Sequence, residues 1–301
     1  MTKPIIVGVD GTSAGSAAIA WAARRASRLG RPLEILHVID DAWGALGARQ
    51  LAELHPEASR LVAEAAVLAA TVAPQLVCTV RVETGDPIVE LVASSRTANM
   101  VVVGTHKTGF FHGRALGSRS LQLAAASRCP VAIIPGFTSS RREGVLVGVD
   151  DSVGGDAALA FAAREARAAH EPLVLLHAIP PSRFPAATST STVAVTVSAI
   201  KRARTLGATD SVRCRTVHRR PAEALIDSSV HAALVVLGST RRLGSDLTAL
   251  GPVVHDVLMN IGGPTVVVHA DFSTPASSPT PDRTPELVDA DQTPRDFRPR
   301  G

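Results

Sequence analysis

The chain of 301 residues is long enough for two domains, and its 46% hydrophobic residues can supply a sizeable core. Its formal net charge of +4 is small, and seven Phe, two Trp and no Tyr offer little surface for stacking on bases, which argues against a nucleic-acid-binding protein. No apolar run reaches the roughly 18 residues of a membrane span, and the N-terminus lacks a secretory signal pattern. The three cysteines are widely separated and form neither a disulfide framework nor a metal pattern, so we expect a cytoplasmic protein.

The first half of the chain alternates between apolar, β-branched runs and amphipathic stretches. This pattern predicts strands at residues 5–9, 33–38, 77–82, 100–103 and 131–134, and helices at 13–29, 46–72, 87–96 and 118–127. Alternation at these lengths is typical of βαβ crossovers and a parallel sheet covered on both faces. We therefore predict an α/β fold with a doubly wound parallel sheet.

The second half repeats this order. Residues 5–10 (IIVGVD) recur 140 positions later as residues 145–150 (VLVGVD). Beyond the second strand the offset falls to 134, as between Pro87 and Pro221. A constant offset with one net deletion indicates a tandem duplication, so we expect two domains of the same fold. We call them copy one and copy two.

We place the domain boundaries by composition. Copy one is predicted to span 1–138 and copy two 144–270, joined by a short polar linker. Residues 185–197 are rich in Ser, Thr, Ala and Val, so no helix is assigned there. The tail, 271–301, is rich in proline and charge, and we expect it to be disordered.

The candidate site lies where the strands end, because ligands of doubly wound sheets bind beyond the carboxyl ends of the strands. In copy one those ends carry Asp10, Val38 and Gly104. The strand 100–103 leads into a polar loop with several glycines, and Gly117 and Ser118 then open a helix. Glycines allow a close approach of the backbone, and the free N–H groups of a helix start attract anions. The layout therefore favours a phosphate-bearing ligand, although a glycine-rich turn that binds nothing has the same pattern.

The loop lacks the Walker signature and resembles the Gly-x2-Gly-x9-Gly-Ser/Thr signature of the universal stress proteins. Gly104, Gly117 and Ser118 match it, whereas Lys107 stands at the second glycine. In copy two Arg241 replaces the same glycine, and Pro252 replaces the hydroxyl residue. The resemblance covers residues 1–270 and implies a tandem member of the family, with two adenine-nucleotide α-hydrolase-like domains.

The resemblance also implies ATP, with or without Mg2+, as the ligand. Gly8, Val9 and Asp10 would lie beside ribose and adenine, and Val38 would face adenine. The residues implied for ribose and phosphates are Gly104, Thr105, Gly117, Ser118, Arg119 and Ser120, and the ammonium of Lys107 could meet a phosphate. A proline at position 252 removes a hydroxyl and an N–H, so copy two should be the weaker site.

Physical chemistry leaves alternatives for single residues. Asp10 can accept hydrogen bonds from ribose hydroxyls, or it can cap the helix that follows. Ser118 can likewise bind a phosphate or cap its own helix. We interpret His37 and His177, which follow apolar strands, as hydrogen-bonded structural residues.

We considered three functions. The first is a regulatory stress-response protein that binds ATP mainly in copy one, and the second is an ATP-independent module that binds a protein partner. The third is an enzyme, which we do not favour because no catalytic triad, metal cluster or carboxylate pair stands out. We expect no catalytic residue, no metal site, and neither nucleic acid nor membrane as a partner.

The last strand of each copy predicts how the copies assemble. Residues 131–134 and 265–268 are apolar and would leave an exposed sheet edge if each copy stood alone. Pairing the two edges would protect both. We therefore predict an intramolecular pseudo-dimer through these strands, while homodimerisation of whole chains stays open.

Overall fold

The computed structural model describes residues 2–105, 118–136, 142–181, 188–207, 211–240 and 250–270. Copy one contains β1 (Ile5–Gly8), α1 (Ser13–Arg28), β2 (Leu33–Asp40), α2 (Ala48–Val72), β3 (Cys78–Gly85), α3 (Pro87–Ser94), β4 (Met100–Thr105), α4 (Ser118–Ala126) and β5 (Val131–Pro135). Copy two contains β6 (Val145–Gly148), α5 (Val153–Ala169), β7 (Leu173–Ala178), α6 (Thr188–Thr205), β8 (Val212–Val217), α7 (Pro221–Ser229), β9 (Leu234–Ser239), α8 (Pro252–Met259) and β10 (Thr265–His269). The predicted tail lies outside the described residues.

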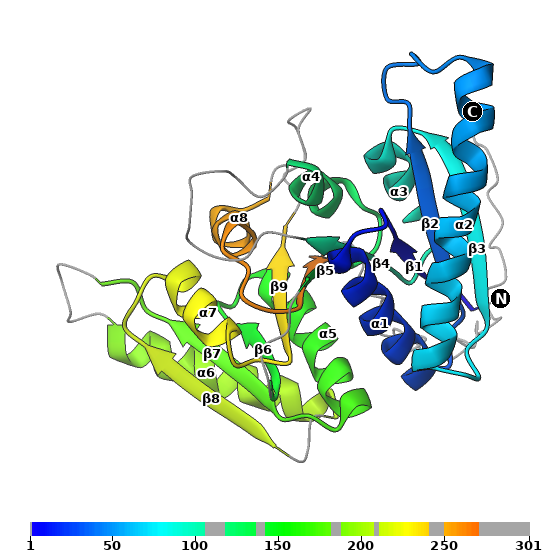
Figure 1. Cartoon of the computed structure of the whole chain (residues 1–301). Helices are drawn as coiled ribbons and strands as arrows, with labels where there is room; N and C mark the ends of the chain where they lie inside the picture. The colour runs from blue at the N-terminus through cyan, green and yellow to red at the C-terminus, as the bar shows by residue number, and fades with distance from the viewer. Residues whose placement is uncertain are drawn as a thin grey trace, which may run out of the picture.

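The ten strands form one sheet in the order β3-β2-β1-β4-β5-β10-β9-β6-β7-β8 (Figure 1). Within each copy all pairings are parallel, and the order reverses on either side of β1 and of β6. This is the doubly wound arrangement that the sequence predicts, and it places a crevice at the carboxyl ends of β1 and β4.

The two copies join through their last strands, as predicted. β5 and β10 pair antiparallel, with Thr265 opposite Ile133, Val266 opposite Ala132 and Val267 opposite Val131. Val131 and Val267 are completely buried. The pairing removes one edge from each sheet, which is the physical reason for the prediction.

Two hydrophobic cores cover the two faces of the sheet, and both continue from one copy into the other. One contains residues of α1, α2, α5 and α6, for example Val62 and Phe161. The other contains residues of α3, α4, α7 and α8, for example Leu123 and Val257. The copies therefore share their hydrophobic cores as well as a sheet.

A buried ion pair also joins the copies. Arg25 of α1 donates from Nε and Nη2 to Glu165 of α5, at 3.1 and 2.5 Å. Their side chains are only 4% and 5% exposed, and the guanidinium of Arg25 lies 5.7 Å from the ring centre of Phe161. Arg28 contacts the same carboxylate at 3.5 Å.

Some boundaries differ from the predicted ones. β2 continues two residues beyond the predicted end at 38, and β3 runs three residues beyond 82. The two strands pair along their whole length, up to Asp40 opposite Gly85, so each supports the extension of the other. α6 forms where no helix was assigned, because tertiary packing of Ala199 and Ala203 outweighs the weak helix propensity of β-branched residues.

Candidate functional site

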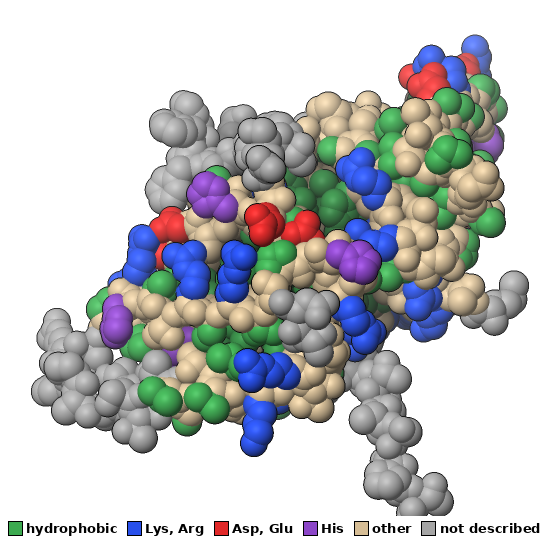
Figure 2. Space-filling view, turned by 90° about the horizontal axis from the view of Figure 1, so that it is seen from below, with side chains coloured by type: hydrophobic (Ala, Val, Ile, Leu, Met, Phe, Trp, Pro, Cys, Tyr) green, Lys and Arg blue, Asp and Glu red, His purple; other side chains and the backbone are tan. Residues whose placement is uncertain are grey.

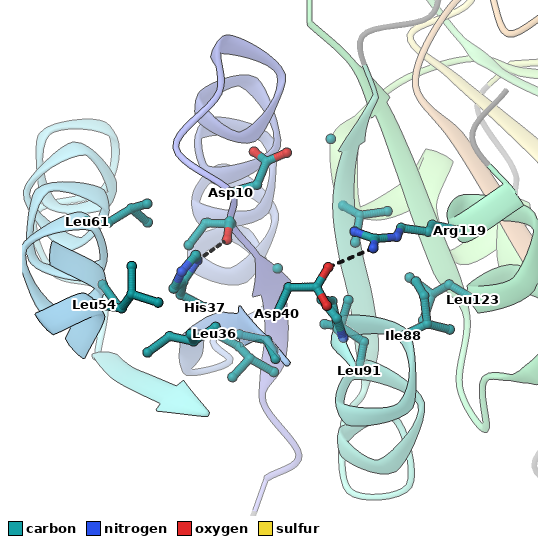
Figure 3. A pocket seen from close by; sticks show the side chains of 18 of the residues that line it. Asp10, Leu36, His37, Asp40, Leu54, Leu61, Ile88, Leu91, Arg119 and Leu123 are labelled. Carbon is teal, nitrogen blue, oxygen red and sulfur yellow. Dashed lines mark hydrogen bonds and ion pairs between the residues drawn. The ribbon is translucent and has the colours of Figure 1, made fainter. Parts of the chain in front are cut away.

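A cavity of about 570 Å³ opens at the carboxyl ends of β1, β2 and β4 in copy one, between α2, α3 and α4 (Figure 3). Seven of the residues predicted for the ligand line this cavity, namely Gly8, Val9, Asp10, Val38, Gly104, Arg119 and Ser120. Its volume is in the usual range for a small-molecule site. The sheet thus brings together residues that lie more than a hundred positions apart in the chain.

The start of α1 fixes the carboxylate of Asp10. Thr12 is the N-cap, since its side chain accepts a hydrogen bond from the N–H of Gly15 at 3.1 Å. Asp10 Oδ1 in turn accepts from the backbone N–H and the hydroxyl of Thr12, at 3.1 and 2.5 Å. Asp10 therefore supports the capping residue rather than capping the helix itself. Its Oδ2 accepts no hydrogen bond from the described residues and can accept one from a ligand.

His37 is hydrogen-bonded to the backbone, as the sequence predicts, and it also lines the cavity. Its Nδ1 lies 2.8 Å from the carbonyl oxygen of Val9, a bond drawn in Figure 3. Because a carbonyl only accepts, Nδ1 must carry a proton, and a neutral ring then leaves Nε2 as an acceptor. His177 makes the same bond to Val149 at 2.9 Å in copy two.

An ion pair connects β2 to α4 at the cavity. Arg119 Nη2 donates to Asp40 Oδ2 at 2.7 Å (Figure 3). This hydrogen bond is the main reason why the pKa of Asp40 lies below its ordinary value. Asp40 is not among the predicted site residues, because the predicted strand ends at residue 38; a strand prediction up to residue 40 would include it.

Leucine and isoleucine side chains form the walls of the cavity. Leu54 and Leu61 come from α2, Ile88 and Leu91 from α3, and Leu123 from α4. Figure 3 shows those of α2 on one side of the strand ends and those of α3 and α4 on the other. These residues are not among those predicted for the site, because their helical spacing also fits a purely structural core. Together they give the cavity apolar walls suited to a flat heterocycle.

Close packing explains why residue 104 is a glycine. A Cβ atom at this position would overlap the backbone of Ala14 at the start of α1. Gly238 of copy two would clash in the same way with Gly154, the residue that corresponds to Ala14. Both glycines allow the first helix to approach the fourth strand of its copy, which brings the start of that helix to the strand ends.

The remaining predicted residues divide into two groups. Thr105 ends β4, is buried and does not line the cavity. Lys107 and Gly117 lie outside the described residues. Ser118 begins α4, although the structure describes only its backbone.

Copy two repeats the arrangement at the start of its first helix. Ser152 caps α5, and Asp150 Oδ1 accepts from the backbone and hydroxyl of Ser152 at 3.1 and 2.7 Å. Pro252 is the first residue of α8, and Gly251 before it offers no side-chain cap. Arg241 lies outside the described residues, so the predicted difference between the two sites stays a prediction.

In the described part of the chain, no group of three or more His, Cys, Asp and Glu side chains could hold a metal ion. No helix within those described ranges has the length and apolar character needed to cross a membrane.

Comparison with known proteins gives consistent matches. The sequence model of the universal stress protein family matches residues 1–135 and again residues 142–269. A universal stress protein of Mycobacterium tuberculosis is 32% identical over 294 residues, covering 89% of this chain and 97% of the relative. One from Mycolicibacterium smegmatis is 32% identical over 287 residues, covering 88% and 96%. The crystal structure of a universal stress protein from Archaeoglobus fulgidus has the same fold, with a TM-score of 0.73 and 18% identity over 90% of this chain and 100% of that one.

Proposed function

This chain belongs to the universal stress protein family, and on that basis we propose that it is a regulatory protein that binds an adenine nucleotide, ATP above all, in the cavity of copy one. One observation carries the proposal. The cavity combines apolar walls with fixed polar groups at the strand ends, and it is large enough for a nucleotide.

The apolar part of the cavity suits the base. Adenine is flat and largely apolar on its faces, so the leucine and isoleucine side chains of α2 and α3 can pack against it. Its exocyclic amino group donates hydrogen bonds. His37 lines the same cavity, and Nε2 is an acceptor in the neutral ring, which favours a base with a donor.

The polar part suits the sugar and the phosphates. Asp10 keeps one carboxylate oxygen available for a ribose hydroxyl. Arg119 and Ser120 lie in the first turn of α4, where the backbone N–H groups carry the positive end of the helix dipole. A guanidinium can pair with phosphate oxygens in two places at once, and Arg119 would exchange part of its contact with Asp40 for such a pair.

The finer parts of the proposal concern the second copy and catalysis. We propose that copy two binds nucleotide more weakly, because Pro252 removes a hydroxyl and an N–H at the helix start. We further propose that ATP acts as a bound signal and that the protein is not an enzyme. Mg2+ would enter with the phosphates rather than through a protein metal site.

Calorimetric titration of the full chain with ATP tests the proposal. We expect binding that Arg119→Gln weakens about tenfold, the effect of losing one charge-assisted hydrogen bond. Arg96→Gln is the matched control, because Arg96 is an exposed arginine that does not line the cavity. GTP should bind more weakly than ATP, since its base carries a carbonyl where adenine has the amino group.

Two outcomes would contradict the proposal. No heat and no thermal shift at millimolar ATP would mean that the chain does not bind the nucleotide, and would favour the ATP-independent, partner-binding alternative. Equal weakening by Arg119→Gln and Arg96→Gln would show that net charge, and not the cavity, attracts ATP. Rapid release of phosphate from bound ATP would contradict the non-enzymatic role.

A further inference from the structure

A second cleft, of about 500 Å³, lies between the two copies, at the amino-terminal ends of the copy-one strands β1, β4 and β5. It is therefore at the opposite end of these strands from the nucleotide cavity. Besides Arg25, which is paired with Glu165, its cationic residues are Lys3, Arg31 and Arg128 of copy one and Arg164 of copy two. We call it the basic cleft.

The described residues do not balance the charge of the basic cleft. Glu165 is the one carboxylate among its lining residues, and that carboxylate is already bonded to Arg25 and contacted by Arg28. Among the described residues, none of the four cations forms an ion pair. Arg31 donates only to the carbonyl oxygen of Lys3, at 3.2 Å. Four unpaired cations around one recess attract an anion, and the field between low-dielectric walls is stronger than on an open surface.

The duplication shows that the fold does not require these cations. The residues of copy two that correspond to Lys3, Arg31 and Arg128 are Glu143, Glu171 and Gly262. The same fold thus accepts acids or glycine at three of the four places. These three positions are positively charged in copy one and not in copy two. A requirement of the fold therefore does not explain the cations of copy one.

A related cleft on the other side of the copy interface differs from the basic cleft in its counter-charges. It holds about 170 Å³ and is lined by Trp21, Arg24, Arg28 and Glu171, among others. Arg24 corresponds to Arg164 of the basic cleft, 140 positions away. Here the cations face Glu171 as well as Glu165, so this smaller cleft carries its own counter-charges. On the face drawn in Figure 2, Lys and Arg side chains are spread over both copies. Surface cations alone therefore do not indicate a binding site, whereas a recess whose cations lack counter-charges does.

We propose that the basic cleft is an anion site for a small molecule that carries two or more phosphate groups. Its volume suits a small molecule. Three of its four unpaired cations are arginines, whose planar donor pairs match phosphate oxygens. Because residues of both copies line the cleft, such a ligand would also hold the copies together. The proposal does not depend on nucleotide binding at the cavity of copy one.

Calorimetric titration of the full chain with inorganic tripolyphosphate tests the proposal. We expect one site per chain, weakened about tenfold by Arg164→Gln and by Arg128→Gly, which introduces the residue of copy two. Arg24→Gln is the matched control, since it removes the same charge from the corresponding position of the other cleft and should leave the affinity unchanged. Arg119→Gln, in the nucleotide cavity, should also have no effect on this site. Circular dichroism of each variant checks its folding.

Each remaining outcome overturns the proposal. Absence of binding at millimolar tripolyphosphate means that the basic cleft is not an anion site. Equal losses for Arg164→Gln and Arg24→Gln mean that the anion responds to net charge alone. A loss confined to Arg119→Gln means that tripolyphosphate occupies the nucleotide cavity instead.

Discussion

Replacing Arg25 by Glu should damage the copy interface strongly, because Arg25 is the buried partner of Glu165. The change sets two carboxylates against each other at a site where both side chains are at most 5% exposed. Two unit charges about 4 Å apart interact by about 4 kcal/mol at an effective dielectric constant of about 20. Loss of one partner from a buried pair costs about 3 to 5 kcal/mol by itself, because the remaining charge stays desolvated. We therefore expect Arg25→Glu to lower the free energy of unfolding by at least about 4 kcal/mol.

Trp21 gives a direct assay, because it packs against the core beside this interface. The other tryptophan, Trp43, is 94% exposed and can be replaced by Phe without disturbing the core. Urea unfolding followed by the fluorescence of Trp21 then reports the stability of the interface. Small-angle scattering shows at the same time whether the copies separate.

A double-mutant cycle supplies the control. Arg25→Met and Glu165→Met should each destabilise the protein by about 3 to 5 kcal/mol, whereas the double variant should lie close to wild type because no buried charge remains unpaired. The difference is the coupling energy of the pair. If the two single losses simply add in the double variant, the ion pair does not couple the copies and the reasoning is wrong.

Four other experiments test separate parts of the structure. Gly104→Ala should destabilise copy one by about 1 to 3 kcal/mol, because the added Cβ overlaps the backbone of α1; unchanged urea unfolding would contradict the close approach. Val267→Asp should cost about 4 kcal/mol or more and promote aggregation, since Val267 is fully buried at the strand junction; a compact, equally stable variant would refute the edge pairing. Cys129, whose pKa burial raises to about 12, should resist thiol reagents at pH 8 until urea unfolds the chain, and rapid labelling of the native protein would disprove its burial. Because Arg119 lowers the pKa of Asp40, their ion pair stabilises the fold above the ordinary pKa of 3.8, and this stabilisation is lost as the pH falls through the lowered value. An NMR titration of Arg119→Gln should show that the pKa of Asp40 rises, and an unchanged value would rule out the ion pair.

The repeat made most of the fold predictable from the sequence. Local apolar runs located the strands, and the constant offset between the copies showed that both have the same fold. The unprotected edges at residues 131–134 and 265–268 then predicted the junction. The strands, the duplication and the junction all follow from apolar runs and their spacing, which can be read from the sequence.

The site was predictable only in part, because side chains that meet across the sheet leave no local signal. Asp40 joins the cavity only because β2 and β3 extend each other, and the apolar walls come from helices whose spacing also fits a core. The pairing of Arg25 with Glu165 did have a signal. The two residues occupy the same position in the two copies, 140 apart, and carry opposite charges.

The junction of the two copies also decides which edges of the sheet face the outside. After β5 and β10 pair, the free edges are β3 and β8. Arg81 and Glu83 lie on β3, and the exposed Arg213 and Arg215 lie on β8. Charged edges resist the addition of a further strand. The sheet therefore has a fixed length and should not grow into filaments by adding strands at β3 or β8.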